Sequence, residues 1–76
     1  MRLRRKPEPS ETTARARKRV ERLSTPEILT WADTAGAGIA RALSDHQRDG
    51  NPDSLEDAYE GLLTMLGVVE ELKHRC

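Results

Sequence analysis

The sequence predicts a small all-α protein in which two long helices form an antiparallel hairpin, preceded by a short basic helix. Three observations lead to this prediction: apolar residues recur at spacings of three and four over two long segments, helix-starting residues precede each segment, and a Gly-Asn-Pro turn separates them. At 76 residues the chain forms one domain at most, in a size range where a single core is marginal and oligomerisation is common.

The first nine residues contain two prolines and one large aliphatic side chain, Leu3. So little apolar surface does not offset the entropy lost on ordering, so we expect residues 1–9 to be disordered. Ser10 is a suitable N-cap for a short helix over about residues 11–23. Because the apolar stripe of this helix is thin, we expect the helix to fray unless it docks on the hairpin or on a ligand. The stripe consists of Ala16, Val20 and Leu23.

The start of the second helix is the clearest local signal in the chain. Thr25 as the N-cap places Pro26 at the first helical position, where proline is well tolerated. Ser24 as the N-cap instead gives a Ser-x-x-Glu capping box with Glu27. Both choices start a helix over about residues 26–49, which the Gly-Asn-Pro turn ends.

The third helix is predicted over about residues 54–75. Asp53 and Glu56 resemble a capping box at its start, and its last turn is cationic, which suits the negative end of the helix dipole. Because only about four residues separate the second and third helices, the two must be antiparallel neighbours.

Charge divides the chain into a basic N-terminal arm, residues 1–23, and a helical hairpin domain, residues 24–76. The arm carries nine basic and three acidic residues, and the hairpin four basic and ten acidic, so the net charge is zero. We expect the arm to bind a polyanion such as DNA or RNA without base specificity, because no aromatic residue interleaves with the basic ones. Attraction of the arm to the acidic hairpin, or plain solvation, are the alternatives. The residues assigned to polyanion binding are Arg4, Arg5, Lys6, Arg15, Arg17, Lys18, Arg19 and Arg22.

The third helix carries more apolar surface than its hairpin partner can cover, since its apolar arc exceeds half of the helix circumference. A two-helix hairpin would leave several of four side chains in water: Leu63, Met65, Val68 and Leu72. The first helix, a second copy or another protein must cover them. Because the first helix is mostly charged, we favour a second copy and a dimeric four-helix bundle. The predicted interface residues are Trp31, Ile39, Leu43, Tyr59, Leu62, Leu63, Met65, Leu66, Val69 and Leu72.

The second helix has small residues around its apolar seam and a tryptophan at the edge of that seam. The small residues favour close approach of another helix over a merely flexible stretch. Trp31 is interpreted either as an interface anchor or as a lid over the core beneath the first helix. The small residues are Ala35, Gly36, Gly38, Ala40 and Ala42.

No catalytic or metal site is predicted. The soft metal ligands lie at opposite ends of the hairpin, His46 about 30 Å from His74 and Cys76. Ser44, His46 and Asp49 do not form a catalytic triad, because residues two apart on a helix point in different directions. We therefore expect no enzyme activity, cofactor or small-molecule substrate. One cysteine cannot form an internal disulfide and no window is apolar enough to span a bilayer, so we expect a cytoplasmic protein with no membrane role.

One ligand pattern lies at the turn over residues 49–60. Oxygen-bearing side chains occupy ligand positions of an EF-hand calcium loop, but Ser54 replaces the glycine of its sharp turn. A turn followed by an acidic first helical turn explains the same residues. The side chains are Asp49, Asn51, Asp53, Asp57 and Glu60.

The functional prediction is a noncatalytic interaction protein that self-associates through the hairpin and presents its basic arm to a polyanion. The first alternative is an antitoxin- or adaptor-like regulator that binds a protein target through the apolar face of the third helix and Trp31. The last alternative is a calcium-responsive helix-loop-helix at residues 49–60.

Overall fold

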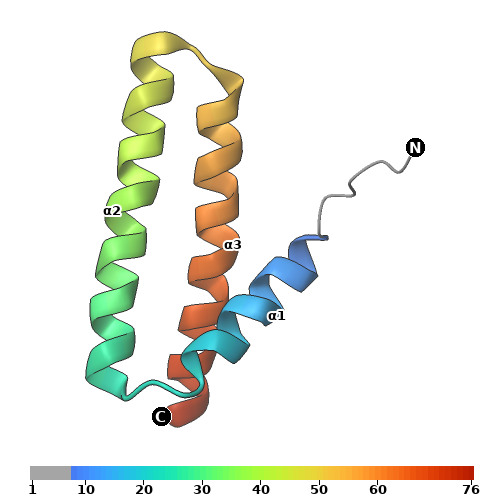
Figure 1. Cartoon of the computed structure of the whole chain (residues 1–76), viewed down its shortest axis with the longest axis vertical. Coiled ribbons are helices and arrows are strands. Elements are labelled where there is room, and N and C mark those ends of the chain that lie inside the picture. The colour runs from blue at the N-terminus through green and yellow to red at the C-terminus, as the bar shows by residue number, and fades with distance from the viewer. Residues whose placement is uncertain (1–7) are drawn as a thin grey trace.

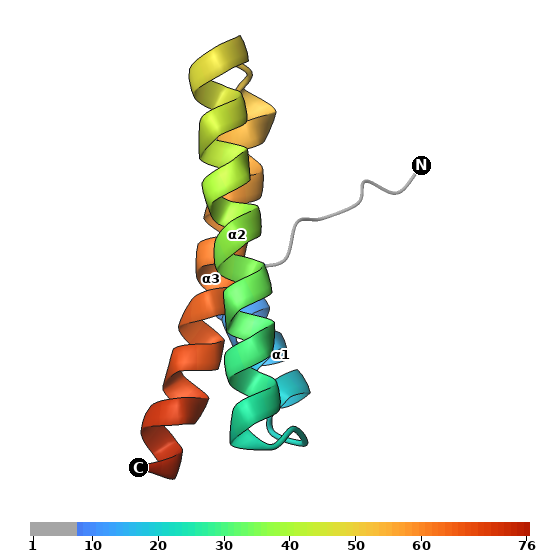
Figure 2. The same ribbon diagram turned by 90° about the vertical axis from the view of Figure 1, so that its left-hand side faces the viewer.

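A computed structural model describes residues 8–76 of the chain. These residues form three helices and no strand: α1 (Pro9–Val20), α2 (Thr25–Asp49) and α3 (Pro52–Arg75). The predicted all-α class is therefore confirmed. α2 and α3 run side by side in opposite directions, and α1 packs against the C-terminal half of α3 (Figures 1 and 2). The layer measures 39 × 35 × 15 Å and has α3 in its middle.

A capping box starts α2, as one of the two predicted alternatives requires. The Ser24 hydroxyl accepts a hydrogen bond from the Glu27 backbone N–H at 3.3 Å, and the Ser24 N–H donates to Glu27 Oε1 at 2.8 Å. The hydrogen bond from the Ser24 N–H, followed by an interaction with the Ser24 side chain, holds the pKa of the Glu27 carboxyl below its usual value. Gly50 ends the helix with φ 66°, in the left-handed region that glycine adopts without strain.

The predicted starts of α1 and α3 are wrong by two residues each. Glu8 is the N-cap of α1 and makes no side-chain capping bond, so Ser10 lies inside the helix. Asn51 is the N-cap of α3 and accepts from the Asp53 N–H at 2.9 Å, so the expected pairing of Asp53 with Glu56 does not start the helix. Proline at the first or second helical position explains both early starts, since its fixed φ suits a first turn.

The ends of the basic arm also differ from the prediction. Disorder was expected through residue 9, but Pro9 already belongs to α1. The rest of that expectation falls on residues 1–7, which lie outside the described part of the chain. α1 ends at Val20 instead of Leu23, and Leu23 packs against the core from the connection to α2.

The core draws one fully buried side chain from each helix: Val20, Ile28 and Val68. α1 is therefore docked on the other two helices, the condition under which it was expected to be stable. It also covers apolar surface of α3 that was assigned to a second copy. Val68 is buried and the other three residues named there, Leu63, Met65 and Leu72, are half-buried. That assignment is wrong, because α1 offers a small buried face beneath its charges.

Two glycines of α3 lie at close contacts with the neighbouring helices. A Cβ on Gly67 would overlap the Thr13 carbonyl oxygen and lie 2.9 Å from the Arg17 backbone nitrogen. A Cβ on Gly61 would lie 2.6 Å from Ile39 Cγ1. By contrast, a Cβ on Gly38 would meet nothing within 4 Å. Of the small residues of α2 for which close packing was predicted, Gly38 thus has open space beside it, whereas Ala42 is buried.

Candidate interaction surfaces

The face of α3 that neither neighbour covers is apolar. Five side chains spaced by four and three residues lie along it, each between 42% and 54% exposed. At about 100° per residue they form one stripe, and two exposed leucines of α2 flank the α2–α3 seam on the same side. We call these seven residues the apolar face: Leu29, Leu43, Leu55, Tyr59, Leu62, Leu66 and Val69.

The predicted interface residues divide into two groups. Five belong to the apolar face: Leu43, Tyr59, Leu62, Leu66 and Val69. The other five are partly buried inside the chain: Trp31, Ile39, Leu63, Met65 and Leu72. Trp31, Met65 and Leu72 pack against the core, Ile39 faces Gly61, and Leu63 lies beside α1, where its carbonyl accepts from the Thr13 hydroxyl at 3.0 Å.

The contact of α3 with α2 is made by small residues of α3. Ala58 is buried, and a Cβ on Gly61 would lie 2.6 Å from Ile39 Cγ1, so α2 approaches closely there. The large side chains Leu55, Leu62 and Val69 lie outside this contact, on the apolar face.

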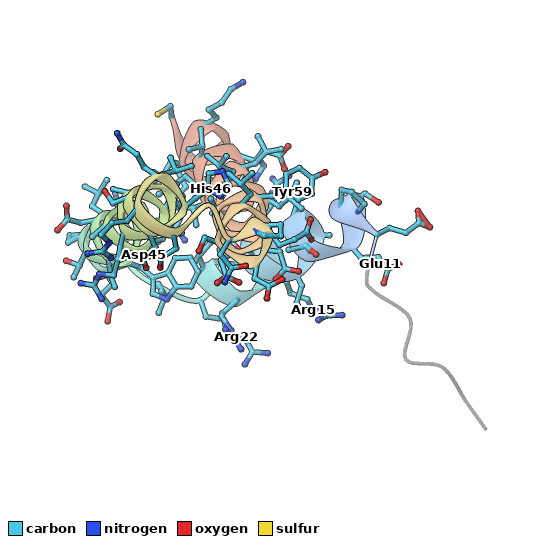
Figure 3. All side chains as sticks on the ribbon, turned by 90° about the horizontal axis from the view of Figure 1, so that it is seen from above. Glu11, Arg15, Arg22, Asp45, His46 and Tyr59 are labelled. Atoms are coloured by element: carbon cyan, nitrogen blue, oxygen red, sulfur yellow. The ribbon has the colours of Figure 1, made fainter. Side chains whose placement is uncertain are left out.

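Three cations of α1 and one just beyond its end form a second surface, which we call the basic stripe: Arg15, Lys18, Arg19 and Arg22. All four are exposed, their spacing puts them on one side of the helix, and they line a common shallow depression. Within residues 8–76 none of them takes part in an ion pair. Figure 3 shows Arg15 and Arg22 on the opposite side of the layer from Tyr59.

The other predicted polyanion-binding residues are placed differently. Arg17 turns toward α3, where its Nε lies 3.5 Å from Glu71 Oε1 and its Nη1 lies 4.0 Å from Glu70 Oε1. Its charge is thus directed to the acidic part of the chain, which was one of the alternatives for the arm. The remaining three residues, Arg4, Arg5 and Lys6, lie outside the described part of the chain.

A partly buried ion pair joins the ends of all three helices, and it was not predicted from the sequence. Arg75 Nε donates to Glu71 Oε2 at 2.9 Å, and the Glu71 side chain is 7% exposed. The same guanidinium donates to the Glu21 carbonyl and to the Thr25 hydroxyl, both at 3.2 Å. The Arg75 hydrogen bond holds the pKa of the Glu71 carboxyl below its usual value, although burial opposes this shift. Glu71 and Arg75 are four residues apart on one helix, and this spacing of opposite charges is the sequence signal that could have identified the pair.

Because its pKa is lowered by folding, charged Glu71 stabilises the fold above its ordinary pKa near 4.5. This contribution is lost as the pH falls through the lower folded-state pKa. We expect Glu71→Gln to lower the melting temperature at neutral pH and to reduce the further loss seen on acidification. Thermal unfolding followed by circular dichroism from about pH 7 to pH 3 measures both effects. Glu70→Gln, the matched control, should change them less; equal effects of the two variants would contradict the role of Glu71.

The structure does not assemble the other candidate sites. Only Gly50 and Asn51 separate α2 from α3, and Asp53 and Asp57 lie within α3, so the calcium-binding loop is not formed. His46 instead contacts the Asn51 carbonyl through Nδ1 at 2.9 Å. No group of three or more His, Cys, Asp or Glu residues suited to a metal ion is present in residues 8–76. Over the same residues, no helix has the length and apolar content needed to cross a membrane.

Comparisons of the chain with protein-family models, with curated proteins and with solved structures find no match.

Proposed function

We propose that this chain is a noncatalytic interaction protein that self-associates through the apolar face and presents the basic stripe to a polyanion. The observation that carries the proposal is the position of the two surfaces on opposite sides of one helical layer. Because of this arrangement, association through the apolar face leaves all four cations of the basic stripe open to solvent.

A second copy of the chain suits the apolar face because the stripe along α3 is complementary to itself. In an antiparallel pair of α3 helices, Leu62 of one copy lies opposite Leu66 of the other, and Tyr59 lies opposite Val69. Leu29 and Leu43 then extend the contact to α2. Two copies of the α2–α3 pair would complete a four-helix bundle and remove the exposed large apolar side chains from water.

A polyanion suits the basic stripe because its four charges are close together and unpaired. Binding of phosphates to such a surface releases counterions, so it weakens steeply with salt and does not depend on base sequence. DNA and RNA are the partners of this chemistry. We place this role in the cytoplasm, the compartment expected for a chain with one cysteine.

The adaptor alternative combined the apolar face of α3 with Trp31. Trp31 borders a depression together with Arg15 and Arg19, on the side of the layer that carries the basic stripe. One protein target would therefore not cover both features at once. This observation favours the self-associating protein.

Two variants test the two halves of the proposal in one experiment. Leu62→Asp places a charge in the apolar face, and we expect it to weaken self-association at least about tenfold in sedimentation equilibrium. Because Leu62 is 54% exposed, the variant should keep its helical circular dichroism, and its melting temperature should match that of the parent protein diluted until it is monomeric. Glu60→Ala, two residues away, should self-associate like the parent protein.

The second variant replaces all four residues of the basic stripe by alanine. It should still self-associate, but its salt-sensitive binding to mixed-sequence duplex DNA should be lost. Truncation of residues 1–23 is a poorer test, because it removes Val20 from the core. A monomeric parent protein would contradict the first half of the proposal, and unchanged DNA binding by the four-alanine variant would contradict the second.

A further inference from the structure

The fold brings the only tryptophan of the chain next to two arginines of the basic stripe. A depression of about 260 Å³ lies where α1, α2 and α3 meet. Arg15 and Arg19 line it from α1, and Trp31 lines it from α2. The three remaining lining residues are Thr12, Ala16 and Thr64. The sequence separates the aromatic residue from the cations, so this juxtaposition arises from the tertiary structure alone.

The chemistry of this depression differs from that of the rest of the basic stripe. Arg15 and Arg19 are exposed guanidinium groups, which bind phosphate oxygens, often with two parallel hydrogen bonds. Trp31 is half-buried: it packs against the core and also borders the depression. An indole in this position offers an apolar aromatic surface beside two phosphate-binding groups. None of the lining residues is acidic, so no carboxylate there repels a phosphate.

Aromatic rings next to a cationic track are the usual elements of single-strand binding, because every base has a ring face that can stack while the cations hold the backbone. A paired base of a duplex is already stacked and does not offer its face. We propose that the depression accepts one base of a single-stranded nucleic acid against Trp31, with the adjoining phosphates on Arg15 and Arg19. Lys18 and Arg22 then contact the next phosphates along the basic stripe. This inference rests on the proposed polyanion binding and adds the class of ligand.

Trp31 is also the probe for the test, since its fluorescence is the only tryptophan signal of the chain. The full-length protein is titrated at low salt with an oligothymidylate of about 12 nucleotides, with an oligouridylate of equal length, and with an abasic oligonucleotide that has the same number of phosphates. We expect both base-containing strands to quench and shift the Trp31 emission. The abasic strand should bind at least about fivefold more weakly and leave the emission unchanged. A difference between the first two strands tells whether DNA or RNA is preferred.

A matched pair of double variants separates the depression from the overall charge. One double variant combines Arg15→Ala with Arg19→Ala, and the other combines Lys18→Ala with Arg22→Ala. Each removes two cations from the basic stripe. In both variants, the slope of the logarithm of the binding constant against the logarithm of the salt concentration should become smaller in magnitude by about 1.4. Only the variant that lacks Arg15 and Arg19 should lose the tighter binding of base-containing strands over abasic strands. Trp31→Leu, which keeps apolar cover over the core, should abolish the same advantage when binding is followed by the anisotropy of a labelled strand.

The outcomes distinguish this inference from the function on which it rests. Equal binding of the abasic and base-containing strands, without a change in Trp31 emission, overturns the base site and leaves polyanion binding intact. Absence of binding by all three strands at low salt overturns both. Equal effects of the two double variants on the advantage of bases would also overturn the base site, since Lys18 and Arg22 do not line the depression.

Discussion

Ile28→Ala is expected to lower the free energy of unfolding by about 2–5 kcal/mol, the range for truncation of a large buried aliphatic side chain. Ile28 is completely buried and joins Val20 of α1 to Val68 of α3. Removal of its side chain therefore leaves a cavity where all three helices meet. Since small domains have little stability in reserve, we expect a large fraction of the variant to be unfolded at about 25 °C. Urea unfolding followed by circular dichroism measures the change.

Leu29→Ala is the matched control for Ile28→Ala, because the two neighbouring side chains have opposite environments. Leu29 is 55% exposed on the apolar face. Its truncation should change the unfolding of the monomer by less than about 1 kcal/mol and act mainly on self-association. A larger loss of monomer stability from Leu29→Ala than from Ile28→Ala would show that α2 presents a different face to the core.

Gly67→Ala is expected to detach α1 from α3 and to cost about 1–3 kcal/mol or more. The added Cβ would overlap the Thr13 carbonyl oxygen and crowd the Arg17 backbone nitrogen. Both are backbone atoms of α1, so no side-chain rotation relieves the overlap and α1 itself must move. Val20 and Val68 would then lose part of their cover. Hydrogen exchange of the α1 backbone amides should become faster while the amides of α2 stay protected.

Gly38→Ala is the matched control for Gly67→Ala. Its added Cβ meets nothing within 4 Å, so the higher helix propensity of alanine should stabilise α2 by about 1 kcal/mol. The two glycine-to-alanine changes are thus expected to have opposite signs. Stabilisation of the protein by Gly67→Ala would mean that α1 does not pack closely on α3.

The helix boundaries were largely predictable because local interactions determine them. The Ser24–Glu27 capping box and the left-handed Gly50 act within a few residues. The sequence pattern gave the capping box as one of two alternatives and predicted that α2 ends at Gly50. The starts of α1 and α3 were missed by two residues because the prolines at these starts were assigned to disorder or to the turn. Greater weight on proline at the first helical turn would have corrected both.

The candidate surfaces were predictable only in part. The basic stripe follows from the spacing of Arg15, Lys18, Arg19 and Arg22, but the different position of Arg17 depends on acidic residues of α3 that are distant in the sequence. The apolar face contains residues of the predicted interface, yet Met65 and Leu72 of that prediction pack inside the chain. When apolar residues cover more than half of the circumference of a helix, their pattern does not indicate which of them contact each neighbouring helix and which stay exposed.

By itself, the sequence determined that there are three helices with these approximate bounds, that strands are absent from residues 8–76, and that positive charge gathers before residue 24. These properties depend on composition and on contacts within about one helical turn. Only the tertiary structure decided that α1 covers one side of α3, which face of α3 stays open, and that Trp31 lies beside Arg15 and Arg19. The physical reason is steric: Ala58, Gly61 and Gly67 let neighbouring helices approach closely, and the fit of three helices around these positions sets how α3 is turned.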